Sequence, residues 1–159
     1  MKITSSLNNL YHYQEVSNNK QKTASKTLDE LSMDERALLN KLQARDSEVK
    51  AHEAAHKAVG GALAGSASYS YQKGPDGKMY AIGGEVPISM KEGQTPQETL
   101  TNARVIKAAA LAPANPSAQD YAVASAATVM ELKAQQEILK QTQAKLEAKK
   151  SYNTADQVL

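Results

Sequence analysis

The sequence predicts an α+β fold that is predominantly helical, with one β-hairpin and a long last helix. At three predicted helix starts, a Ser or Thr is followed three positions later by Glu or Asp, which is the spacing of a capping box. Once, alternating residues flank a Gly-Pro-Asp-Gly turn, as in a hairpin. We therefore expect a helix that contains the sequence His-Glu-Ala-Ala-His at residues 52–56 to pack with one hairpin and with two further helices.

The chain is expected to have three parts. Residues 1–27 are rich in Asn, Ser, Lys and Gln without a sustained period, which predicts a flexible polar leader. Residues 28–132 have the patterns of a single domain, and residues 133–159 are predicted to form a charged helical tail. The chain has no Phe or Trp, so its core buries little area and a bound metal would add useful stability.

The first helices are predicted from capping signals. Ser32 and Glu35 have the spacing of a capping box, which predicts a helix from Met33 to about Arg45. Asp46 can cap a second, short helix that ends at Gly60-Gly61. The motif at residues 52–56 is therefore expected on a helix bounded at both ends.

The hairpin is predicted by alternation on both sides of the turn at residues 74–77. Its strands cover residues 67–72 and 79–82. Gly83-Gly84 then permit a kinked backbone, which can aim the following Glu85 inward.

Two more helices are predicted downstream. Thr95 caps a helix with Pro96 at its first position, and this helix should extend to Leu111. Prolines at 113 and 116 interrupt the chain, and Ser117 begins the last helix, which becomes charged and glutamine-rich after Lys133.

Composition excludes several classes of function. The formal net charge of +2 is small and evenly mixed with acids, so neither a nucleic-acid nor a membrane partner is expected. The N-terminal residues contain no apolar run of the length of a signal peptide or a membrane span, which favours a cytoplasmic protein. Because the chain has no cysteine, metal ligands must be nitrogen and oxygen donors.

The motif His-Glu-Ala-Ala-His at residues 52–56 matches the zinc-peptidase pattern H-E-x-x-H. Residues four apart lie on one face of a helix, so His52 and His56 can reach a single Zn²⁺ ion. Glu53 is rotated by about 100° from His52 about the helix axis. At this place its carboxylate can act as a catalytic base without ligating the metal. The alternative is that both histidines are ordinary surface or core-edge residues of an alanine-rich helix.

A catalytic zinc site usually has three protein ligands, so a third donor is required. Glu85 is our first candidate, because it follows two glycines and is the charged residue of an otherwise apolar stretch. Its alternative role is an exposed carboxylate at a strand edge. Asp120 is the second candidate, although capping of the last helix or support of a ligating imidazole would explain it equally well.

With these segments in view, the chain resembles a bacterial family called SprA-related, whose members are described as H-E-x-x-H metalloproteases. The resemblance covers residues 42–129 and rests on motifs in a fixed order. These are Arg45-Asp46, Glu48-Val49, the motif at 52–56, Gly60-Gly61, Tyr71-Gln72, Gly74-Pro75-Asp76-Gly77, Tyr80-Ala81, Gly83-Gly84-Glu85-Val86, Ala109-Ala110-Leu111-Ala112-Pro113, and Pro116-Ser117 with Gln119-Asp120. The resemblance implies zinc held by His52 and His56, with Glu53 as base.

The leading expectation is therefore a zinc-dependent metallopeptidase that hydrolyses peptide bonds with Glu53 as base and with His52, His56 and Glu85 as metal ligands. Its partner would be a peptide or protein substrate. A second hypothesis is a non-enzymatic interaction module that a structural zinc ion stabilises. In that case the long C-terminal helix would bind a partner, and self-association through Leu132, Leu139 and Leu146 is one possibility because they recur every seven residues.

Overall fold

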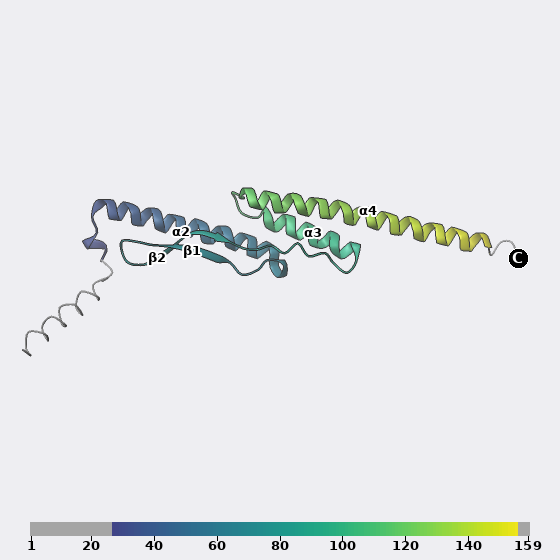
Figure 1. Ribbon diagram of the computed structural model, residues 1–159, viewed down its shortest axis with the longest axis horizontal. Helices are drawn as coiled ribbons and strands as arrows, with labels where there is room; N and C mark the ends of the chain where they lie inside the picture. The colour runs from purple at the N-terminus through teal and green to yellow at the C-terminus, as the bar shows by residue number, and fades with distance from the viewer. Residues whose placement is uncertain (1–26, 156–159) are drawn as a thin grey trace, which may run out of the picture. The chain divides into compact units, whose positions relative to one another are not determined.

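The computed structural model describes residues 27–155, and Figure 1 labels their main helices and strands. Almost all of the predicted leader, including His12, lies outside these residues. The α+β, mainly helical fold class is confirmed. The elements of the described part are η1 (Leu28–Glu30), α2 (Met33–Gly60), η2 (Gly61–Leu63), β1 (Ser68–Lys73), β2 (Met79–Glu85), α3 (Pro96–Ala110) and α4 (Ala118–Ala155).

Helix α2 begins where the capping box predicts. The backbone N–H of Glu35 donates to Ser32 Oγ at 3.2 Å, and Ser32 N–H donates to Glu35 Oε2 at 2.8 Å. The predicted break near Asp46 is wrong, because α2 continues without interruption to Gly60.

Two features explain this continuity. No Gly or Pro occurs within the first 27 residues of α2, and Leu42, Val49 and Glu53 extend one buried face through the expected boundary. The carboxylate of Asp46 does not cap a helix but accepts a hydrogen bond from Ala81 N–H at 2.8 Å. A residue that can cap a helix is therefore used here to bind the hairpin.

The end of α2 agrees with the prediction. Gly61 has φ of 52°, a left-handed conformation that favours glycine after a helix. A Cβ at Gly60 would lie 2.6 Å from Ala64 Cβ and 3.3 Å from Ala109 Cβ, so this glycine permits a close approach of the chain.

The predicted hairpin is confirmed as the antiparallel pair β1 and β2. Gly74 N–H donates to Lys78 O at 2.8 Å across the turn, and Gly77 adopts a φ of 81°. Asp76 is buried beneath the turn, where its Oδ1 accepts from Lys78 N–H and its Oδ2 accepts from the Tyr80 hydroxyl at 2.8 Å. Asp76 therefore has a structural role in the hairpin.

The chain divides into two compact units. The described part of the first contains residues 27–47 and 70–82, and the second contains residues 48–69 and 83–155. The first unit is built around a small core in which Tyr80 meets three leucines, Leu31, Leu39 and Leu42.

The second unit contains the end of α2, together with α3 and α4, which lie side by side (Figure 1). Thr95 caps α3 by accepting from Glu98 N–H at 3.2 Å, as predicted. The core between α3 and α4 consists of Ala103, Ile106, Ala127 and Met130, with Leu63, Ile88 and Val123 packed against it. The alanines permit close helix packing, and this unit carries the candidate site.

Among residues 27–155, no helix has both the length and the apolar character that crossing a membrane requires.

We predict a pH-dependent contribution of Asp76 to stability. Burial alone would raise the pKa of Asp76, but hydrogen bonds from Tyr80 and Lys78 and the positive charge of Lys78 lower it below the ordinary value of 3.8. A carboxyl with a lowered pKa in the folded state contributes stability above its unfolded pKa and loses it as pH falls through the folded pKa. Asp76→Asn should therefore destabilise the protein at pH 7, and the difference from the parent protein should shrink below about pH 4.

Denaturant unfolding of both proteins between pH 2 and pH 7 would measure this difference. A difference that stays constant through the acidic range would show that the charge of Asp76 does not contribute.

Candidate metal centre

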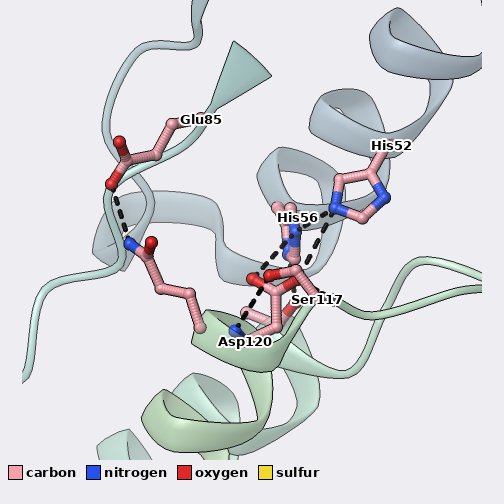
Figure 2. Close-up of polar contacts among 7 residues, drawn as sticks. His52, His56, Glu85, Ser117 and Asp120 are labelled. Atoms are coloured by element: carbon pink, nitrogen blue, oxygen red, sulfur yellow. Dashed lines mark hydrogen bonds and ion pairs between the residues drawn. The ribbon is translucent and has the colours of Figure 1, made fainter. Parts of the chain in front are cut away.

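Helix α2 places both histidines of the motif on one face. His52 Nε2 and His56 Nε2 lie 3.1 Å apart, and the ring planes meet at 75° (Figure 2). The spacing of four residues in a regular helix produces this approach, as the sequence predicted. The two nitrogens are close enough to bind the same ion.

The ring of His56 is held by α3. Its Nδ1 lies 2.9 Å from the backbone oxygen of Ala109, and a carbonyl can only accept, so Nδ1 carries the proton and donates. In the neutral ring Nε2 then bears the lone pair, which is the form that binds a metal. The end of α3 thus supports the ring from behind.

Helix α4 brings a carboxylate to the two rings. Asp120 Oδ1 lies 3.3 Å from His56 Nε2, and Asp120 Oδ2 lies 3.5 Å from His52 Nε2. The same residue completes the capping box of α4. Its N–H donates to Ser117 Oγ at 3.2 Å, and Ser117 N–H donates to Asp120 Oδ2 at 2.6 Å. The helix start therefore fixes the direction of the carboxylate.

The group is closed on one side and accessible on the other. The side chain of His56 is 3% exposed and that of Asp120 14%, whereas that of His52 is 28% exposed. Burial alone would raise the pKa of Asp120, but hydrogen bonds from Ser117 and, whenever the rings are protonated, the charges of His56 and His52 outweigh it, so the pKa is lowered. The ionised carboxylate is the form that binds a cation.

These residues form a group that can hold a metal ion: His52, His56 and Asp120. With His56 neutral, its lone pair faces a carboxylate oxygen at 3.3 Å. Two atoms that both offer lone pairs repel each other at this distance unless a proton or a metal ion lies between them. A cation bound by all three residues would remove this repulsion.

Glu53 lies beside the histidines and is only 3% exposed. Its Oε2 is buried and has no hydrogen-bond partner within the described part of the chain. The carboxylate packs directly on the backbone of Gly84, where a Cβ would lie 2.8 Å from Glu53 Cγ and 2.9 Å from Oε1. A buried carboxylate oxygen without a partner is costly, so it requires a reason beyond folding.

The structure places Glu85 outside the group of three donors. Its carboxylate is exposed, and its Oε1 accepts a hydrogen bond from Gln119 Nε2 at 3.0 Å (Figure 2). Of the two candidates for the third ligand, the geometry thus favours Asp120.

Sequence reasoning missed the contributions of Ala109 and Gly84. A backbone carbonyl has no signature of its own in a sequence. The only available signal was the place of both residues within the ordered motifs at 83–86 and 109–113.

The fold and the donors together define a small, mainly helical α+β protein with a candidate metal centre on an H-E-x-x-H helix. The model of the SprA-related family matches residues 6–158, nearly the whole chain, so the chain belongs to the SprA-related family. Comparisons with curated proteins and with solved structures gave no match.

We predict that metal binding depends on Asp120 and not on Glu85. Asp120→Asn keeps an oxygen that can cap α4 but loses the charge, and it should weaken binding of Zn²⁺, used as the probe, by more than the roughly 10- to 100-fold expected from loss of a supporting group. His56→Ala should have an equal or larger effect, because one of three donors is lost.

Glu85→Gln is the matched control, since it removes one carboxylate charge from the same unit. Competition with a chromophoric chelator would give the affinities. If Glu85→Gln lost the metal while Asp120→Asn retained it, the third ligand would be Glu85.

Proposed function

We propose that this protein is a zinc-dependent peptidase in which His52, His56 and Asp120 hold the metal and Glu53 is the catalytic base. The observation that carries the proposal is the combination of three convergent donors with the buried carboxylate of Glu53, which follows His52 in the same helix and whose Oε2 has no partner among residues 27–155.

The spacing of the donors supports zinc. Zinc binds nitrogen and oxygen donors at about 2.0–2.2 Å, usually as a tetrahedron, and the donors of such a tetrahedron lie about 3.3–3.5 Å apart. The two imidazole nitrogens lie 3.1 Å apart, and the Asp120 carboxylate approaches each of them through a different oxygen, at 3.3 Å from His56 and 3.5 Å from His52. With one atom taken from each residue, the three donors lie within 4.8 Å of one another. Two imidazoles and a carboxylate are also a donor set that suits zinc, and the chain has no thiol to replace them.

The number of donors favours a catalytic over a structural site. Structural zinc sites are usually closed by four protein ligands, whereas catalytic sites have three and leave one position open. Within residues 27–155 the group contains three donors, and His52 is its most exposed member. An open position on this accessible side would admit water and substrate.

The chemistry assigned to the chain is acid–base catalysis. A bound zinc ion lowers the pKa of water and polarises a carbonyl group. Glu53 accepts the proton of the attacking water and passes it to the departing amine, so that the C–N bond breaks and a new carboxylate forms. Burial of Glu53 against Gly84 holds the carboxylate in one position and excludes bulk water.

We predict that Glu53→Gln retains the fold and the metal but loses peptide hydrolysis. Glutamine has nearly the same size and cannot accept the proton, so the rate should fall by roughly 10²- to 10⁴-fold. The assay would incubate zinc-loaded protein with a mixture of unfolded proteins and identify new N-termini by mass spectrometry.

Gly84→Ala offers an independent test of the position of Glu53. The added methyl group would meet the carboxylate at less than 3 Å, so hydrolysis should fall while zinc content is unchanged. Hydrolysis by Glu53→Gln at the parental rate would exclude Glu53 as the base, and zinc loss in that variant would make it a ligand.

The C-terminal part of α4 supports a second proposal, helix-mediated self-association. Leu132, Leu139 and Leu146 are 54%, 62% and 62% exposed and recur every seven residues along the helix. Leucines at this spacing can occupy one of the two seam positions of a coiled coil, and the other position is held by Val129, Gln136 and Gln143. This activity would be compatible with either a catalytic or a structural metal ion.

Sedimentation equilibrium would test the self-association. The full chain should form dimers at high concentration, and replacing Leu139 and Leu146 by Gln should shift it toward monomers, because burial of two leucine side chains per chain is lost. Identical masses for the two proteins would exclude this seam.

A further inference from the structure

Glu85 carries an exposed carboxylate that one hydrogen bond orients. Its Oε1 accepts from Gln119 Nε2 at 3.0 Å, and its backbone oxygen lies 3.4 Å from Ser68 Oγ, which donates to it. Within the described residues, neither contact neutralises its charge, because an amide and a hydroxyl are neutral donors. By contrast, Glu131 of the same unit forms an ion pair, since its Oε1 lies 2.9 Å from Arg104 Nε.

Two neighbours of Glu85, Gly84 in the chain and Gln119 across the hydrogen bond, connect it to the candidate metal centre. The residue before it, Gly84, contacts the carboxylate of Glu53. Gln119, which holds its side chain, directly precedes Asp120 in α4. Figure 2 shows Glu85 to one side of the group formed by His56 and Asp120, bridged to α4 by the Gln119 hydrogen bond.

A carboxylate held in this way can recognise a cation. Ordering a long side chain before binding lowers the entropy that an ion pair must overcome. The neutral amide orients the carboxylate and leaves the second oxygen available to a charged donor. Metal coordination would use Asp120, so it would leave the Glu85 carboxylate available to a ligand.

We propose that Glu85 is a specificity-determining residue that binds a positively charged group of the peptide substrate. The chemistry is that of an ammonium or guanidinium group, from a Lys or Arg side chain or from a free N-terminus. The proposal rests on the proposed peptidase function, because that function makes a peptide the ligand. The test measures peptide binding and does not require peptide hydrolysis.

The probe is a set of acetylated and amidated alanine hexapeptides with one arginine placed at each position in turn. A matched set carries citrulline, which has the same shape but no charge. Binding to the zinc-loaded Glu53→Gln variant is measured by calorimetry. We expect at least one arginine peptide to bind roughly 3- to 10-fold more tightly than its citrulline partner, the range between an exposed ion pair and a charge-assisted hydrogen bond.

A third arm compares the all-alanine peptide with a free and with an acetylated N-terminus. A preference for the free amine in this arm, without one for arginine, assigns Glu85 to the N-terminus of the substrate. A preference for arginine alone assigns it to a side chain.

When Glu85→Gln is added to the Glu53→Gln variant, charged and uncharged peptides should bind with nearly equal affinity, and zinc content should be unchanged. Glu147→Gln is the control for the loss of one charge, because Glu147 is exposed on the distal part of α4, and it should retain the preference. Higher salt should also weaken the preference, because the pair is exposed.

The proposal would be overturned if no peptide bound measurably, or if no arm showed a preference for the charged peptide. It would also be overturned if the preference survived Glu85→Gln. Loss of zinc in Glu85→Gln would also overturn it, since Glu85 would then be a ligand. Cleavage without a charge preference would leave the peptidase function intact, and charge-dependent binding without cleavage by the parent protein would refute the peptidase function alone.

Discussion

The hydrogen bond from His56 Nδ1 to the backbone oxygen of Ala109 is the contact on which the candidate site depends. It joins residues 53 positions apart and fixes both the tautomer and the orientation of the buried ring. The close approach of α2 to Ala109 is favoured by Gly60, where an added Cβ would lie 3.3 Å from Ala109 Cβ. Ala109 and Ala110 are fully buried, so small residues on both sides allow the approach. Without this contact the lone pair of His56 Nε2 would have no fixed direction.

Asp120 shows how a local requirement of helix formation can place a carboxylate in the candidate metal centre. The start of α4 needs an acceptor for the Ser117 N–H, and the Asp120 carboxylate supplies it at 2.6 Å. The positive end of the helix dipole also favours an anion at this place. Because capping fixes the carboxylate, no separate structure is needed to direct it toward His52 and His56. Metal binding and the first turn of α4 should therefore stabilise each other.

Much of the fold could be predicted from local signals. Capping boxes gave the starts of α2 and α4, the Thr95-Pro96 pair gave that of α3, and the turn at 74–77 gave the hairpin. The continuity of α2 could not be predicted, because an aspartate that can cap a helix is indistinguishable in sequence from one that binds a strand, as Asp46 does.

The same limit applies to the third donor. The sequence supported both Glu85 and Asp120 as the third ligand. Only tertiary packing decides which of the two carboxylates lies near the histidines. The pair of histidines could be predicted from the sequence, because residues four apart in a helix lie next to each other on its surface. Thus the half of the candidate site that lies on one helix could be derived, and the half that depends on packing could not.

The burial of Glu53 is the strongest argument against a purely structural role for the motif. An unsatisfied buried polar group costs about 1–3 kcal/mol, and more when it is charged. Alanine at this position would remove the unpartnered oxygen and would fit an alanine-rich helix, so folding alone gives no reason for a carboxylate. Glu53 is not within the group of donors, so metal binding alone gives none either. A group that exchanges protons with a transient partner, such as water or a departing amine, needs an oxygen that the protein itself leaves unpaired. The unpartnered Oε2 of Glu53, fixed against a backbone that has no side chain at Gly84, meets that requirement.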